Sequence, residues 1–117
     1  MVTRAVIALI LFSLTSSANA AMVLFKDYKA PKDKWEKAFN KVYLGGVTQG
    51  LISFDAELRI EGRQRLFCLP EKLALTDEQA ENIMMREAQK MADPGRLPVS
   101  LILINGLEET FPCDEKH

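Results

Sequence analysis

The sequence predicts an all-α fold, a small helical bundle in which a helical hairpin is closed by one disulfide. Three observations support this prediction. Apolar residues recur at spacings of three and four along three stretches of the chain. A helix-capping signature precedes the second stretch. Cys68 and Cys113 flank the second and third stretches, so a bond between them would tie the ends of a hairpin together.

The first twenty residues have the organisation of a secretory signal peptide. Arg4 gives a short positive region, an apolar run covers residues 5–12, and Ala18-Asn19-Ala20 forms a small-x-small cleavage site. The apolar run is shorter than the roughly 20 residues that a membrane-spanning helix needs. We therefore expect removal of residues 1–20, export to the periplasm without a membrane anchor, and a single mature domain over residues 21–117.

The composition of the mature chain argues against several classes of function. Without Arg4, the 15 basic residues fall to 14, against 16 acidic residues. Nucleic-acid binding needs a stripe of positive charge, and the sequence contains none. It also shows no acid–base pair, metal cluster or glycine-rich phosphate loop. We expect no enzyme, catalytic residue, metal or cofactor.

Cys68 and Cys113 have three possible roles. A catalytic thiol needs a base, and the one histidine is His117, the last residue. A metal site needs about four ligands, which two cysteines cannot supply. In an oxidising compartment a disulfide is the expected state. Closing a loop of this length would stabilise the fold by about 4 kcal/mol in the chain-entropy model.

The first predicted helix begins at Asp33 and has one apolar face, which we expect in the core. Its members are Trp35, Phe39, Val42, Tyr43, Val47, Leu51 and Phe54. Gly45, Gly46 and Gly50 each cost up to about 1 kcal/mol in a helix. They indicate that another element packs closely there, unless Gly50 ends the stretch. The preceding residues 21–31 are expected to be irregular.

Residues 55–65 alternate charged and apolar side chains, and two interpretations remain open. A period of two favours a strand over residues 56–60. The same stretch could instead extend the first helix as far as Gly62.

The second predicted helix opens with a capping box formed by Thr76 and Gln79, and Leu75 can pack on Ala80 as a hydrophobic staple. Asp93-Pro94-Gly95 ends it. Its apolar face comprises Ala80, Ile83, Met84, Ala88 and Met91.

The third predicted helix starts at Pro98, a residue favoured in the first helical position. Its apolar positions are Val99, Ile102, Leu103, Leu107 and Phe111. A buried strand over residues 101–104 is the alternative. We favour the helix because two helices of similar length in a hairpin would bring Cys68 near Cys113. The residues expected to be largely buried across the whole fold are Trp35, Phe39, Tyr43, Ile83, Met84, Ile102, Leu103 and Leu107.

Several motifs together resemble a known family. They are Tyr43-Leu44-Gly45-Gly46-Val47, Phe67-Cys68-Leu69-Pro70, Leu75-Thr76 with Gln79, and Leu107 through Phe111-Pro112-Cys113. This arrangement, from Trp35 to Cys113, resembles the Rap/Tai group, the periplasmic immunity proteins of type VI secretion systems. The Phe-Cys-x-Pro and Phe-Pro-Cys elements are its most specific part.

The resemblance implies a compact helical fold, a signal peptide and a bond between Cys68 and Cys113. It also implies a cognate secreted effector as the partner. In the best-known members this effector is a peptidoglycan amidase with a Cys–His active site, and the immunity protein, often a homodimer, occludes its cleft. Lys41 and Val42 stand where many members carry a further cysteine, which indicates a divergent branch.

Binding to an effector requires exposed, complementary groups. The candidates are the charged residues 55–65, the turn over residues 92–97, and the exposed face of the second helix. The residues that we expect to bind the effector are Asp77, Glu78, Glu81, Asp93 and Arg96. Arg86 and Lys90 are further charged residues on the exposed face of the second helix. Arg96 in the turn could reach acidic groups in an active-site groove. The simpler interpretation is a helix connector with solvated charges.

The alternative function is a periplasmic chaperone of the acid-stress type. Such proteins are also small and helical, and they expose apolar surface when carboxylates become protonated at low pH. They are expected to carry long charged tails and to bind many clients, so we favour the immunity function.

Overall fold

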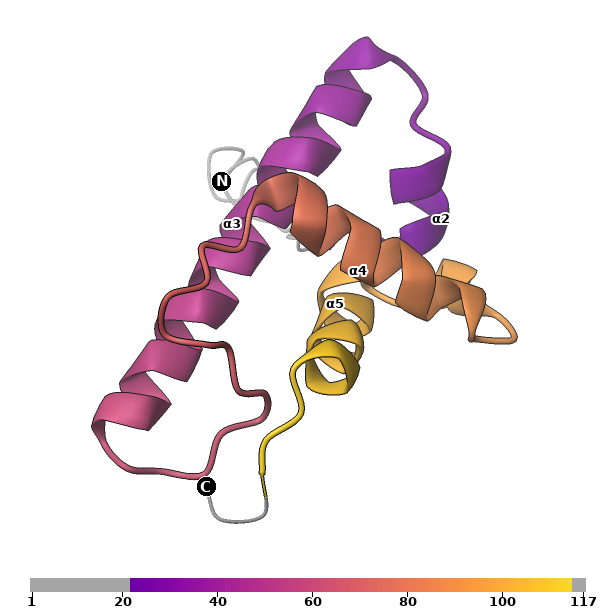
Figure 1. Ribbon diagram of the computed structural model, residues 1–117. Coiled ribbons are helices and arrows are strands. Elements are labelled where there is room, and N and C mark those ends of the chain that lie inside the picture. The colour runs from indigo at the N-terminus through magenta and orange to yellow at the C-terminus, as the bar shows by residue number, and fades with distance from the viewer. Residues whose placement is uncertain (1–21, 115–117) are drawn as a thin grey trace, which may run out of the picture.

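The computed structural model describes residues 22–114, which form four α-helices and one 3-10 turn (Figure 1). Their bounds are Phe25–Lys29 (α2), Lys34–Ile60 (α3), Asp77–Gln89 (α4), Pro94–Arg96 (η1) and Val99–Thr110 (α5). The described residues contain no strand, only an isolated bridge between Leu24 and Pro98. The predicted all-α fold is confirmed. The predicted signal peptide, residues 1–20, and His117 lie outside the described residues.

Helix α3 begins and ends at recognisable caps. The Asp33 side chain accepts a hydrogen bond from the Glu36 backbone N–H at 2.8 Å. At the other end Gly62 adopts φ 64°, and the Arg63 N–H donates to the Leu58 carbonyl at 2.9 Å. This closure uses the left-handed conformation that glycine adopts without penalty. Of the two interpretations of residues 55–65, the helix extension ending at Gly62 is therefore correct.

The predicted core face of α3 is wrong in part. Trp35 and Val42 are each 76% exposed, and Phe39 and Phe54 are each 52% exposed. Three of the predicted residues, Tyr43, Val47 and Leu51, do pack against the core. The fully buried positions of this helix are instead Asn40, Leu44, Thr48, Asp55 and Leu58.

The inward face of α3 is partly polar because each buried polar group has a partner. The Asn40 amide donates to the Asp27 carbonyl at 3.2 Å. The Thr48 hydroxyl donates to the Leu44 carbonyl, four residues earlier, at 2.8 Å. A buried polar group that keeps its hydrogen bonds costs little. Apolar periodicity alone could not identify this face, since the partners come from the folded structure.

Helices α4 and α5 pack against each other and form the centre of the core. The predicted capping box is confirmed, with Thr76 and Gln79 bonded in both directions at 2.9 and 3.1 Å. The predicted strand over residues 101–104 is excluded, because these residues are helical. The buried residues of the two helices are Ala80, Ile83, Met84, Ala88, Val99, Ile102, Leu103, Gly106 and Leu107.

The disulfide Cys68–Cys113 is present, with its Cα atoms 5.0 Å apart. It joins the segment before α4 to the segment after α5, as predicted. The Cys68 N–H also donates to the Phe111 carbonyl at 2.8 Å. Between α3 and α4 the chain turns and runs back along α3, so the disulfide fixes this long connection to the end of α5 (Figure 1).

The N-terminal segment is part of the fold. Residues 21–31 were expected to be irregular, but they contain α2, and Val23 and Phe25 are buried. The Phe25 N–H donates to the Leu97 carbonyl, and the Val99 N–H donates to the Val23 carbonyl. These two bonds hold the segment against the start of α5.

Candidate protein-binding surface

Helix α4 brings three of the five predicted binding residues together. Asp77, Glu78 and Glu81 line one cavity of about 390 Å³ between α3 and α4. The other lining residues are Tyr28, Lys41, Leu44, Gly45 and Asn82. Since Lys41 is the only basic residue in this lining, the cavity mouth is predominantly acidic.

Glu81 is anchored within this cavity by Tyr28, whose hydroxyl donates a hydrogen bond to the Glu81 carboxylate. Burial, then this hydrogen bond, and then the negative charge of Glu81 raise the pKa of Tyr28 above its ordinary value of 10.0. Each of these effects disfavours the phenolate. Glu81 therefore has a structural role in holding α2 to α4 as well as a place in the acidic surface.

The expected close approach at the α3 glycines is confirmed at Gly45 and wrong at the other two. A Cβ at Gly45 would lie 3.1 Å from an Asp77 carboxylate oxygen. A Cβ at Gly46 or Gly50 would meet nothing within 4 Å. Only Gly45 thus serves the contact with α4.

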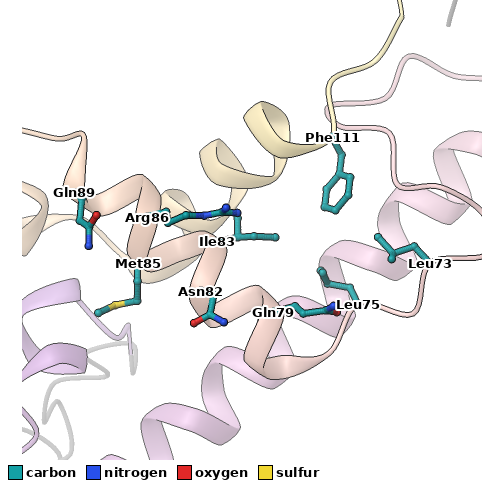
Figure 2. A pocket seen from close by; sticks show the side chains of 9 residues that line it. All are labelled: Leu73, Leu75, Gln79, Asn82, Ile83, Met85, Arg86, Gln89 and Phe111. Carbon is teal, nitrogen blue, oxygen red and sulfur yellow. The ribbon is translucent and has the colours of Figure 1, made fainter.

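A second hollow, of about 560 Å³, lies beside α4 (Figure 2). Its apolar lining consists of Leu73, Leu75, Ile83, Met85 and Phe111, and its polar lining of Gln79, Asn82, Arg86 and Gln89. In Figure 2 Leu73 and Phe111 lie across the hollow from the side chains of α4. An apolar site with a few amide and cationic groups is suited to accept an apolar side chain flanked by hydrogen-bonding groups.

Sequence reasoning identified Arg86 as a candidate but missed the hollow itself. Leu73 and Phe111 come from the two segments that the disulfide joins, so their meeting depends on the tertiary fold. The available signal was Leu73, an apolar residue outside any predicted apolar face.

Asp93 and Arg96 lie in and beside η1, at the opposite end of α4 from Asp77. The Arg96 guanidinium is 4.0 Å from the Asp93 carboxylate, and both side chains are largely exposed. An exposed ion pair of this kind contributes little to stability. The predicted site residues therefore form two separate groups, one at each end of α4.

Lys90, a candidate residue at the end of α4, forms ion pairs with Glu109 of α5 and with Glu87 of α4. Its ammonium lies 2.7 Å from Glu109 on α5 and 3.4 Å from Glu87. The hydrogen bond to Glu109 is the main reason that the pKa of Lys90 is raised and that of Glu109 is lowered. Within residues 22–114 no group of side chains could hold a metal ion, and no helix there is long and apolar enough to cross a membrane.

A helical scaffold that is closed by a disulfide and presents an apolar hollow beside an acidic cavity has the features of a protein-binding domain. The sequence model of the Rap1a immunity proteins matches residues 13–113, and the chain belongs to this family. Searches of curated proteins and of solved structures found no match. Family membership indicates an immunity function against a secreted effector, exerted by binding rather than by catalysis.

Proposed function

We propose that the protein acts in the periplasm, where it neutralises an effector delivered by a type VI secretion system. The effector of this proposal is a peptidoglycan amidase, and the immunity protein, as a homodimer, covers its active site. The family match over residues 13–113 carries the proposal. The pattern of residues 1–20 supports export, because it has the order of regions found in signal peptides.

The fold suits this role because it is held rigid around α4. Ordering loops during association costs affinity, so a preorganised surface binds more tightly. The disulfide fixes the segments on both sides of α4 and α5. The buried pair of Asp55 and Arg65 fixes the connection between α3 and α4. A surface supported in this way loses little conformational freedom on binding.

The surface offers two complementary features along α4. The hollow lined by Ile83 and Phe111 accepts an apolar side chain of the effector. The acidic group of Asp77 and Glu78 attracts basic residues at the rim of the effector's cleft. Together they orient the immunity protein over the active site.

Periplasmic co-expression tests the proposal. The probe is a peptidoglycan amidase effector of a type VI secretion system, sought among the open reading frames adjacent to this gene and directed to the periplasm of a susceptible cell. We expect lysis with the effector alone and normal growth when the full-length immunity protein is present. A version without residues 1–20 should give no protection, and a catalytically inactive effector provides the control for toxicity. Protection by the version without residues 1–20 would contradict the periplasmic site of action.

The chaperone function remains the second candidate because α3 exposes large apolar side chains, Trp35 among them. It predicts weak binding to many unfolded proteins, increasing near pH 3. Measuring aggregation of an unfolded client at pH 3 and pH 7 separates the two functions. Suppression of aggregation without protection against the effector would replace the immunity proposal.

A further inference from the structure

The lysines of the chain are concentrated at one end of the fold. Residues 26–41 contain six basic and three acidic residues, whereas the rest of residues 21–117 contains eight basic and 13 acidic residues. This segment comprises α2, its connection to α3 and the first two turns of α3. In Figure 1 the start of α3 and the connection to α2 project past α4 at one end of the molecule. We call this end the lysine tip, and its basic residues, all exposed, are Lys26, Lys29, Lys32, Lys34, Lys37 and Lys41.

The positive charge of the lysine tip is not neutralised inside the protein. None of its six ammonium groups forms an ion pair with another of residues 22–114. Two of the three neighbouring carboxylates hold the start of α3 instead. Asp33 accepts a hydrogen bond from the Glu36 N–H at 2.8 Å, and the Glu36 carboxylate accepts one from the Lys32 backbone N–H at 3.3 Å. The lysines are therefore available to a negatively charged partner.

An exposed apolar strip starts at the same tip. Trp35 and Val42 are each 76% exposed, and Phe39 is 52% exposed. At about 100° per residue, the three side chains lie within about 60° of one another around the axis of α3. The Lys34 ammonium is 5.8 Å from the centre of the Trp35 ring, so a positive charge and an exposed aromatic ring are adjacent. This pairing suits a membrane–water interface, where the ring lies among the lipid headgroups and the ammonium reaches the phosphates.

A membrane surface that contains anionic phospholipid fits both features of the tip. A cluster of about four to eight lysines beside an amphipathic helix is typical of contact with anionic headgroups. An exposed apolar strip on such a helix enters the boundary between headgroups and acyl chains. We propose that the lysine tip binds the surface of an anionic phospholipid membrane, with Trp35, Phe39 and Val42 entering the headgroup region. The contact is a reversible one at the surface and involves no spanning segment.

The distribution of charge also orients the protein on the membrane. The excess of acidic residues outside the tip is repelled by an anionic surface, so the tip faces the lipid. The apolar hollow beside α4 has no residue of the tip in its lining, and it therefore stays open to the effector. The inference goes beyond the proposed function and shares with it only the periplasmic location. Its test needs no effector, so it can fail while the immunity function holds.

Binding to lipid vesicles tests the proposal, with Trp35 as the reporter. Because Trp35 is the single tryptophan of the chain, its fluorescence reports contact at the tip itself. Protein purified from the periplasm is mixed with vesicles of phosphatidylcholine and phosphatidylglycerol, or of phosphatidylcholine alone. We expect co-sedimentation and a blue shift of the Trp35 emission with the anionic vesicles only. Raising the salt concentration from about 0.1 M to about 0.5 M should weaken this binding at least about tenfold, since salt screens the attraction.

Charge reversal tests the lysines. Lys32→Glu combined with Lys34→Glu changes two charges beside Trp35, and the double variant should fold because acidic residues are favourable at the start of a helix. Its affinity for the anionic vesicles should fall at least about 30-fold. The control, Arg63→Glu combined with Lys72→Glu, makes the same change in net charge at two exposed positions outside the tip. It should bind the vesicles within about threefold of the wild type, since distant charges are screened.

A second pair of variants tests the apolar strip. Phe39→Glu places a charge in the strip, whereas Phe54→Glu changes the same residue type at the same 52% exposure but about four turns further along α3. Neither side chain is in the core, so both variants should fold, and thermal melting verifies this. Phe39→Glu should weaken binding to the anionic vesicles at least about tenfold, and Phe54→Glu should leave it unchanged.

Four results would overturn the proposed membrane contact. One is a wild-type protein that does not bind the anionic vesicles. A second is equal binding to the neutral vesicles, which would leave the lysines without a role. A third is bound protein whose Trp35 emission is unchanged, since another surface would then make the contact. The fourth is a Lys32→Glu and Lys34→Glu variant that binds the vesicles normally but no longer binds the effector, because the tip would then contact a protein.

Discussion

Arg65 forms a bidentate ion pair with Asp55, in which Nε donates to Oδ1 at 2.8 Å and Nη2 donates to Oδ2 at 2.6 Å. Nη2 also donates to the Leu69 carbonyl at 3.3 Å. The hydrogen bond to Asp55 is the main reason that the pKa of Arg65 is raised. Both side chains are largely buried. The pair therefore ties the connection that carries Cys68 to the C-terminal part of α3.

Asp55→Ala should lower the free energy of unfolding by about 3–5 kcal/mol, because it leaves the Arg65 charge buried without its partner. Urea denaturation followed by circular dichroism measures the change. The control is Arg63→Ala, which removes an exposed ion pair with Glu61 and should cost less than about 1 kcal/mol. Equal effects of the two variants would show that the buried pair contributes no more than a surface pair.

Gly106 and Gly50 should respond oppositely to alanine. A Cβ at Gly106 would lie 2.7 Å from Ile83 Cγ2 and 3.1 Å from the Ile83 carbonyl oxygen, so Gly106→Ala should force α4 and α5 apart at a cost of about 1–3 kcal/mol. A Cβ at Gly50 has open space, and Gly50→Ala should stabilise α3 by about 0.5–1 kcal/mol. Thermal melting at one fixed protein concentration should show a lower melting temperature for Gly106→Ala and a higher one for Gly50→Ala. A lower melting temperature for Gly50→Ala would contradict the prediction for that position.

Local patterns predicted the three longer helices and the disulfide, but not α2. The capping signature at Thr76 acts through bonds within one helical turn, so it is visible in the sequence. The helix ending at Gly62 was one of two open interpretations, because a charged period-two stretch is also compatible with a strand. The pairing of Cys68 with Cys113 followed from the cysteine count and from the oxidising compartment that the signal-peptide pattern implies.

The inward face of α3 could not be predicted in the same way. Apolar spacing pointed to the face of Trp35, Phe39 and Val42 as the core, but these side chains are exposed and the core uses the neighbouring face. The burial of this face depends on the hydrogen bonds of Asp55 with Arg65 and of Asn40 with the Asp27 carbonyl. Both join α3 to other segments of the chain. The candidate site was also predicted only in part. The sequence identified the exposed charges on α4, but it did not predict the hollow that includes Phe111, because that hollow arises from tertiary contacts.

The hydrogen bond from Tyr28 to Glu81 should make stability fall at high pH. The folded state raises the pKa of Tyr28 above its ordinary value of 10.0, so the contribution is complete below pH 10 and is lost as the pH rises beyond it. Tyr28→Phe should cost about 1.5 kcal/mol at pH 7, as loss of a hydrogen bond to a charged group. Urea denaturation at pH 7 and pH 11 should show the variant losing less stability than the wild type. A parallel loss in both proteins would assign the pH dependence to other groups.

The last prediction concerns the surface that contacts the effector. Glu78 and Arg96 are exposed at opposite ends of α4, and neither supports the core. Glu78→Arg and Arg96→Glu should each weaken binding to the effector by about tenfold or more, because each places the wrong charge at a complementary interface. Isothermal titration calorimetry measures the affinity, and thermal melting verifies that the variants remain folded.

Glu108→Arg supplies the matched control, since Glu108 is an exposed carboxylate on α5 that lines neither the acidic cavity nor the apolar hollow. It should bind the effector like the wild type. Phe39→Glu tests the other exposed surface, since Phe39 is half-exposed on α3 and lies outside the core. If Glu78→Arg and Arg96→Glu bind the effector normally and Phe39→Glu does not, the effector contacts α3, and the assignment of the α4 surface is wrong.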